Sequence, residues 1–433
     1  MLPLSALLAL ALSAASFQQD PPAPPAQPAD SASVEVAVEA AATAATEVAE
    51  DVAGMRVRPI VSVGSLYSGT RGFGVGGGVA ISNLARRGDR VQIEARVAQR
   101  VLGAFGAYQT GEVERTALFG LVGGSAVTSS RFPFAGTGPH ADPEGRLFLD
   151  RSEAEAEARV AWQPWGVGGP LVQPFARFRV DRLRGFAEAD SGGLARVSQA
   201  DLAALGALVG ETRAGVSVGL GLLSDSRDNE GRPRRGAYVQ ASASRFTSTD
   251  GSGLRFTRAE GTGYLFRPAP FKLPLQPERG ALFVRVAAIV VREDGGGGLP
   301  PIYLPVLDRD LLVGWPSRDF AGRDGLSLGV GARGVLLRNL MAFRVEGTLL
   351  GMIGAAYDDV FREFTPRVST APRPIAAGEN VPLQPSVGFG INLHLRDRER
   401  PLVGALIGIG PGGLTTTSFR IVVGLDRYLP ELR

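Results

Sequence analysis

The stretch that decides the fold is Glu153-Ala154-Glu155-Ala156-Glu157-Ala158-Arg159-Val160-Ala161-Trp162. Its odd positions carry charge as far as Arg159, and every even position carries Ala, Val or Trp. Successive side chains of a β-strand point to opposite faces, so this segment has one ionic face and one apolar face. It predicts a strand with a polar environment on one side and an apolar environment on the other.

The same alternation recurs along most of the chain. Sixteen such segments are predicted between Arg56 and the C-terminus, with no clear helical segment between them. They span residues 57–67, 72–83, 90–101, 103–110, 114–127, 150–162, 171–182, 212–224, 236–246, 253–267, 280–292, 325–337, 341–357, 384–396, 401–410 and 415–427. A soluble sandwich of that many strands would be unusually large, whereas a membrane barrel needs this rhythm around a polar lumen. The predicted fold class is therefore all-β: a transmembrane antiparallel β-barrel of sixteen strands.

Long and short connections mostly alternate after the fifth predicted strand. In outer-membrane barrels the short turns lie on the periplasmic side and the long loops lie outside. An even number of strands then places both ends of the barrel domain in the periplasm.

The composition narrows the classes of partner and site. The chain has 433 residues and no Cys, which leaves no disulfide framework and no thiolate metal site. Its 46 basic and 43 acidic residues are interleaved, and Lys272 is the only lysine. No patch stands out as a phosphate-binding surface, and no nucleic-acid partner is predicted.

The N-terminal part of the sequence predicts export. Residues Leu2 to Leu12 are largely apolar and Ser13 to Ser16 are small, as in a cleaved signal peptide. This apolar run is shorter than the about 20 residues that a membrane-spanning helix needs. The predicted organisation is a signal peptide over 1–16, a disordered periplasmic tail rich in Pro, Ala and acidic residues over 17–55, and a barrel over 56–433.

One polar turn between two predicted strands has a specific order of residues. Its positions are Asp225, Arg227, Asp228, Asn229, Pro233 and Gly236. Taken alone this is turn chemistry, because Asn and Gly accept positive φ and Pro fixes the approach of the chain. As a string, Asp-x-Arg-Asp-Asn followed by Pro-x-x-Gly resembles the signature turn of barrels in the BamA/TamA superfamily, also called bacterial surface antigens.

The loop before the twelfth predicted strand extends the resemblance. In that superfamily this loop folds back into the lumen and carries Leu-Arg-Gly-Tyr or Leu-Arg-Gly-Phe. The corresponding residues here are Leu312, Val313, Gly314 and Trp315, followed by Phe320 and Gly322. The family's Arg is Val313 in this chain, so its ion pair with the wall does not carry over, and Arg318 and Arg323 are the candidate substitutes. Eleven predicted strands precede the loop and five follow it, which is the family's division.

The resemblance implies an outer-membrane protein without enzymatic activity. It implies a role in the insertion or translocation of proteins or lipids, with lipid, client outer-membrane proteins or a separately encoded periplasmic protein as partners. About 38 residues separate the signal from the barrel, too few for one periplasmic POTRA domain, so a barrel-only member is expected. The alternative is a passive channel or structural protein that has lost the assembly role.

Glycines are concentrated in the first two predicted strands. They are Gly64, Gly72, Gly74, Gly76, Gly77 and Gly78. Gly weakens strand pairing and permits curvature or close approach of another backbone. A weak seam that opens laterally, which the resemblance implies, and ordinary barrel curvature both stay open as interpretations.

The remaining candidate sites are lumen charges. They are Glu153, Glu155, Glu157, Arg159, Arg177, Arg179, Asp181, Arg344 and Glu346. Their mixed sign favours a lumen that holds an inward-folded loop by ion pairs over a pore selective for one sign of ion, although wide porins also have mixed charges.

No catalytic residue, cofactor site or metal site is predicted. Both Gly-x-Ser-x-Gly strings, at 215–219 and 325–329, lie within predicted strands without the elbow of a serine hydrolase. The glycine run 72–78 opens a strand and lacks the βαβ context of a dinucleotide loop. Only His140 and His394 are available for histidine chemistry, and both are expected to be ordinary loop or lumen residues.

Overall fold

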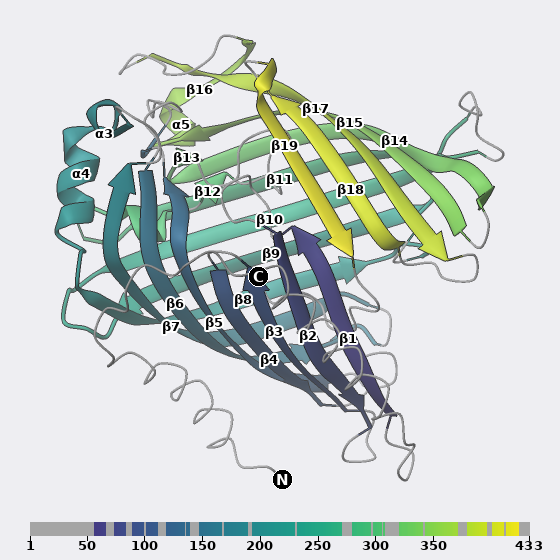
Figure 1. The fold of residues 1–433 in the computed structure, drawn as a ribbon, viewed down its shortest axis with the longest axis horizontal. Coiled ribbons are helices and arrows are strands. Elements are labelled where there is room, and N and C mark those ends of the chain that lie inside the picture. Colours follow the sequence, from purple (N-terminus) through teal and green to yellow (C-terminus); the bar gives the residue numbers. More distant parts are fainter. Residues whose placement is uncertain are drawn as a thin grey trace, which may run out of the picture.

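The structure is a computed structural model, and its sheet is the wall of a barrel (Figure 1). It describes residues 56–65, 73–83, 89–98, 101–110, 118–134, 136–138, 147–166, 169–188, 193–229, 232–270, 279–295, 298–304, 306–307, 320–340, 343–370, 379–395, 401–410 and 413–423. The predicted signal peptide and tail lie outside these residues.

Seventeen strands form one sheet in the described residues. They are β1 (Arg56–Ser65), β2 (Phe73–Ser82), β3 (Arg90–Ala98), β4 (Val101–Gln109), β5 (Leu118–Phe134), β6 (Leu147–Trp162), β7 (Leu171–Glu188), β8 (Thr212–Asp225), β9 (Gly236–Ser248), β10 (Arg255–Pro268), β11 (Ala281–Glu293), β14 (Asp324–Leu340), β15 (Phe343–Tyr357), β16 (Phe364–Val368), β17 (Val381–Leu395), β18 (Pro401–Gly410) and β19 (Gly413–Val423). The short β16 lies parallel to β17, and the other sixteen pair antiparallel in chain order, which confirms the predicted fold class.

The prediction that no helix interrupts the strands was wrong. The connection between β7 and β8 contains α3 (Gly193–Arg196) and α4 (Gln199–Gly206), and α5 (Val360–Glu363) follows β15. The Ser198 side chain caps α4 by accepting a hydrogen bond from the Asp201 backbone N–H at 3.0 Å. Ser-x-x-Asp is a helix-start signal, so local sequence held this information. None of the described helices is long and apolar enough to cross a membrane.

The loop between β11 and β14 has short elements of its own. They are the 3₁₀ helix η1 (Pro301–Tyr303) and a two-stranded sheet of β12 (Val306–Leu307) and β13 (Phe320–Ala321). Figure 1 shows α3, α4, α5, β12 and β13 at the same end of the barrel. This end is called the α4 rim, and the opposite end, which carries the β8–β9 turn at 226–235, is called the turn rim.

The two faces of the wall differ as the alternation predicts. On β17, the outward residues Val387, Phe389 and Ile391 are 54, 46 and 41% exposed, whereas the lumen-facing His394 is 1% exposed. Further exposed apolar residues on outward faces are Ile93, Val97, Leu102, Val160, Phe178, Val218, Leu220, Leu222, Val284, Val286, Leu328, Val330 and Leu349. An apolar band this extensive on the outside of a barrel is the surface that a bilayer covers.

β1 and β19 meet at what is here called the seam. Within the described residues they pair at Gly64↔Val422, near the C-terminal ends of both strands, which meet at their tips (Figure 1). On its other side, β1 pairs with β2 along its whole length, from Arg56↔Ser82 to Ser65↔Phe73. The sheet is therefore continuous from β1 to β19, but in its described residues it is not closed along the seam.

Candidate functional site

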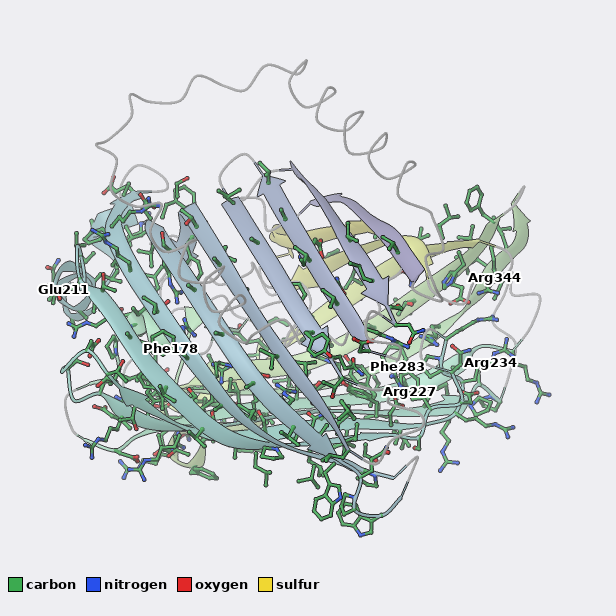
Figure 2. The ribbon with its side chains drawn as sticks, turned by 90° about the horizontal axis from the view of Figure 1, so that it is seen from below. Phe178, Glu211, Arg227, Arg234, Phe283 and Arg344 are labelled. Carbon is green, nitrogen blue, oxygen red and sulfur yellow. The ribbon has the colours of Figure 1, made fainter. Side chains whose placement is uncertain are left out.

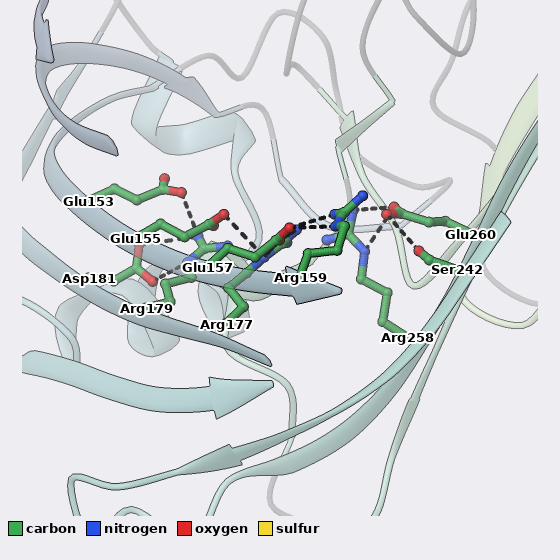
Figure 3. Close-up of polar contacts among 10 residues, drawn as sticks. All are labelled: Glu153, Glu155, Glu157, Arg159, Arg177, Arg179, Asp181, Ser242, Arg258 and Glu260. Carbon is green, nitrogen blue, oxygen red and sulfur yellow. Dashed lines mark hydrogen bonds and ion pairs between the residues drawn. The ribbon is translucent and has the colours of Figure 1, made fainter. Parts of the chain in front are cut away.

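An ionic cluster covers the lumen side of β6 and β7 (Figure 3). The register pairs Glu157 with Arg177 and Glu153 with Asp181, so alternate side chains of both strands meet inside the barrel. Arg177 contacts Glu157 at 2.6 Å and Glu155 at 3.1 Å. The other pairs are Arg159–Glu157 at 2.6 Å, Arg179–Asp181 at 2.6 Å, Arg151–Glu153 at 3.2 Å and the buried pair Arg151–Asp181.

These ion pairs join wall residues to one another. The sequence favoured a lumen in which such charges hold the inward-folded loop, but in the described residues the loop meets the cluster differently. The ring of Tyr303 in η1 lies with its centroid 5.6 Å from the Arg179 guanidinium carbon. This is a cation–π contact, which a desolvated site strengthens. The ionic cluster is therefore largely balanced within the wall.

Apolar side chains fill the lumen beside the α4 rim. They come from β5–β7, β9–β11, the α4 segment and the loop around η1, and this set is called the apolar plug: Phe132, Phe134, Leu147, Leu149, Leu183, Val197, Leu205, Leu208, Phe246, Phe256, Val291, Leu299, Ile302, Tyr303 and Leu304. Tyr303 is central, since its ring centroid lies 5.2 Å from that of Phe246 and 5.8 Å from that of Phe256. Hydrogen bonds hold α4 over the plug, because the Asp201 carboxylate accepts one from the Thr137 backbone N–H at 3.1 Å and one from the Thr137 hydroxyl at 2.7 Å.

The β8–β9 turn is built by its own polar side chains. The Asp228 carboxylate accepts the backbone N–H groups of Arg234 and Arg235 at 2.8 and 3.1 Å. Burial opposes ionisation of this carboxyl, but those hydrogen bonds outweigh it and hold the pKa of Asp228 below its usual range. Asn229 accepts the Arg232 N–H at 2.7 Å, so it acts through its side chain and not through the positive φ expected of it.

Gly236 ends the turn in a conformation that other residues rarely adopt. Its φ is +100°, and an added Cβ would lie 2.1 Å from the Ser226 carbonyl oxygen. Glycine, which has no Cβ, adopts this conformation without the steric clash that another residue would meet. Asp225 and Arg227 form an ion pair at the start of the turn, and the Arg227 guanidinium carbon lies 4.6 Å from the ring centroid of Tyr238.

The turn also contacts the wall strands β14 and β15. Arg232 forms an ion pair with Glu346 of β15, whose side chain is 4% exposed. Arg333 of β14 donates a hydrogen bond to the carbonyl oxygen of Pro233 at 2.8 Å. Because β8 and β15 are separated by several strands in the sheet, these contacts tie distant parts of the turn rim together.

Glu346 has two further basic neighbours. Arg344 Nε lies 3.5 Å and His394 Nε2 lies 3.5 Å from its carboxylate oxygens. His394 was predicted to face the lumen beside Asn392, and the register places it opposite Arg344 with Asn392 opposite Glu346. Three basic side chains thus surround the Glu346 carboxylate at this rim.

The lumen-loop motif is described only at its end. Leu312, Val313, Gly314 and Trp315 lie outside the described residues, whereas Phe320 belongs to β13 and pairs with Leu307. A Cβ on Gly322 would lie 3.0 Å from the Tyr357 carbonyl oxygen, so the loop runs close to β15 here. Asp324, the first residue of β14, accepts from Arg292 of β11 at 2.8 Å and from the Val360 N–H of α5 at 2.9 Å, so it joins both elements where the loop ends.

The seam glycines divide into two kinds. Gly64 stands between Gly74 on β2 and Val422 on β19 in the register. A Cβ on Gly78 would lie 2.1 Å from the Ile93 carbonyl oxygen, so that position needs glycine for the close approach of β3, whereas Gly77 has open space. Gly76 pairs with Arg96, and Gly72 lies outside the described residues. Close approach of β3 thus accounts for Gly78, whereas Gly64 lies at the described contact between β1 and β19.

Sequence reasoning missed four features of this site. Arg232, Arg333, Tyr303 and α4 lie in or beside segments that were interpreted only as turn, strand or loop. The capping signal at Ser198 was available for α4. Nothing local in the sequence indicates that Arg232 and Glu346 meet, because their contact depends on closure of the sheet.

The described fold is similar to solved outer-membrane barrels. BamA from Haemophilus ducreyi, lacking POTRA domains 1-3, matches with a TM-score of 0.58 and 11% identity, over 85% of this chain and 70% of that chain. CdiB from Acinetobacter baumannii matches at 0.47 and 10% over 86% and 60%, and CdiB from Escherichia coli at 0.48 and 10% over 85% and 63%. This chain thus spans less than two thirds of each CdiB chain.

No protein-family model matches the chain, and no curated protein matches it. The likeness to BamA extends over 85% of this chain, most of which is the barrel wall. It agrees with the resemblance of the turn motif and with the division of strands around the long loop. The described chain has the fold of a BamA-type outer-membrane β-barrel.

Proposed function

We propose that this protein is a barrel-only member of the BamA/TamA superfamily that inserts or translocates proteins or lipids at the bacterial outer membrane, without enzymatic chemistry. The observation that carries the proposal is the barrel fold, which is similar to that of BamA, together with the turn motif that resembles the family signature. We place the opening at the seam, where β1 and β19 meet at Gly64↔Val422. Unpaired backbone N–H and C=O groups in lipid cost several kcal/mol each, so strand edges exposed by an opening of this seam would favour pairing with another chain or contact with lipid headgroups.

The filled lumen supports this route over conduction through the barrel. The apolar plug and the balanced ionic cluster occupy the β5–β11 side of the lumen, with Leu147 and Leu205 at 0% exposure. A passive channel, the alternative function, needs a polar water-filled path along the lumen. We also propose client outer-membrane proteins and a separately encoded periplasmic protein as partners.

The test is a disulfide across the seam. The substitutions Gly64→Cys and Val422→Cys place two thiols on directly opposite residues. Opposed antiparallel residues have Cα atoms about 4.5–5.5 Å apart, within disulfide range. The barrel is reconstituted in vesicles, and two readouts are followed: folding of a client barrel by heat-modifiable mobility, and exchange of a fluorescent phospholipid between leaflets. Whichever of these two activities the unmodified barrel shows, oxidation of the seam variant is expected to abolish it. Reduction of the disulfide is expected to restore it.

The matched control is Ala98→Cys with Val101→Cys, a register pair at the hairpin of β3 and β4. It adds the same two thiols within a pair of strands that stay paired whether the seam opens or the protein is a passive channel. Full activity of the oxidised seam variant would overturn the proposal. High ionic conductance of the unmodified barrel in planar bilayers would favour the passive channel instead.

A further inference from the structure

A small pocket at the turn rim is lined mainly by guanidinium groups. Arg232 and Arg234 belong to the β8–β9 turn, Arg279 precedes β11, and Arg333 belongs to β14. Among the lining residues that the structure describes, Glu346 is the one carboxylate, and the others are Gly280, Ala281 and Gly334. The pocket is open to solvent, and its empty space, that open solvent included, is about 200 Å³. It is called the arginine pocket, and Figure 2 shows Arg234 at this end of the barrel with Arg227 and Arg344.

The carboxylate of the arginine pocket already has its partners. Glu346 is paired with Arg232 and lies 3.5 Å from both Arg344 and His394. Asp228, the nearby carboxylate of the turn, accepts the backbone N–H groups of Arg234 and Arg235. Both of these carboxylates therefore already have hydrogen-bond or ion-pair partners other than Arg279 and Arg333.

Arg333 is held in place without a carboxylate of its own. It donates to the Pro233 carbonyl oxygen at 2.8 Å, and its guanidinium carbon lies 5.6 Å from the Phe266 ring centroid. Among the residues that the structure describes, neither Arg333 nor Arg279 forms an ion pair. The ionic cluster on β6 and β7 differs, since Arg177 and Arg179 each have carboxylate partners. A guanidinium that is positioned but electrostatically unmatched in a protein lumen favours an anionic ligand.

We propose that the arginine pocket binds a phosphate group. A phosphate carries up to two negative charges and several acceptor oxygens, which match several guanidinium forks better than a single carboxylate does. The pocket is too small for a folded partner, and a phosphate would lie at its open mouth beside the guanidinium groups. Glycine and alanine in the lining leave the guanidinium donors open to it. This site goes beyond the proposed function, because it lies at the turn rim and requires no opening of the seam.

The test is calorimetric titration of the whole barrel, in a phosphate-free maltoside detergent, with inorganic phosphate at constant ionic strength. Saturable binding is expected. Arg333→Gln and Arg279→Gln are each expected to weaken binding by at least about tenfold, because each removes a charge-assisted donor. The matched control is Arg245→Gln, which removes one guanidinium 62% exposed on β9 near the opposite rim. Heat-modifiable mobility confirms that each variant folds, and Arg279 is an exposed residue outside the strands.

A second arm identifies the source of the phosphate. Native mass spectrometry compares retention of phosphatidylglycerol by the unmodified barrel and by Arg279→Gln. Retention that Arg279→Gln abolishes assigns the group to a lipid headgroup, and binding of inorganic phosphate alone assigns it to a free phosphate. Absence of both kinds of binding, or equal binding by all variants, overturns the site. Neither measurement uses a client, so failure here leaves the proposed function untouched.

Discussion

At the scale of single residues, Glu346 has the most consequences for the turn rim. Its buried carboxylate faces Arg232, Arg344 and His394. Glu346→Gln removes the negative charge that these basic groups face. Removing one partner of a buried ion pair lowers the free energy of unfolding by about 3 to 5 kcal/mol. Urea unfolding in lipid vesicles measures this loss. In a double-mutant cycle, adding Arg232→Gln is expected to recover part of the loss, and strictly additive effects would show that the two side chains are not coupled.

Asp228 predicts a pH dependence of the same turn. Hydrogen bonds from backbone N–H groups lower its folded pKa, so its stabilising contribution is fully present above the unfolded pKa of about 3.9. The contribution is lost as pH falls through the lower folded pKa. Unfolding of Asp228→Asn and of the unmodified chain is compared from about pH 6 to about pH 2. The difference in stability is expected to shrink below about pH 3.9, and a difference independent of pH would count against the assignment.

At the scale of elements, η1 is the part of the long loop that packs into the apolar plug. Tyr303→Ala removes a ring that is 4% exposed and packed on Phe246 and Phe256. Loss of a buried aromatic side chain costs about 3 to 5 kcal/mol. The control is Phe361→Ala on α5, where the side chain is 82% exposed, and a change within about 0.5 kcal/mol is expected. Equal, small effects of both substitutions would mean that η1 does not stabilise the lumen.

The strands were predictable from sequence, whereas contacts across the lumen were not. Alternation in Glu153–Trp162 and in Val387–Leu395 identified both the strands and their faces, because the side-chain period of a strand is strictly local. The capping residue Ser198 is also a local signal, although strand alternation does not reveal it. The Arg232–Glu346 pair and the contact of Tyr303 with Phe246 join segments far apart in the chain. Their partners are set by barrel closure, and one sequence carries no direct signal for that.

At the scale of the whole molecule, the outward apolar band defines how the barrel sits in lipid. Ile391 is 41% exposed on this band, and Ile391→Arg is expected to cost about 2 to 4 kcal/mol near the bilayer midplane. Val127→Arg is the control, because Val127 lies opposite Glu153 on the lumen side and an arginine there gains a carboxylate neighbour. Unfolding in lipid vesicles is the measurement. A larger cost at Val127 than at Ile391 would reverse the assigned faces.

The weak seam is the central claim, and amide hydrogen exchange of the barrel in lipid tests it most directly because it needs no client. Peptides from β1 and β19 are compared with peptides from β3 and β4, which pair continuously from Arg90↔Gln109 to Ala98↔Val101. Amides without a ladder partner exchange through small local openings, whereas paired core amides need larger ones. The account predicts faster exchange in β1 and β19 than in β3 and β4. Equal protection of all four strands would contradict it.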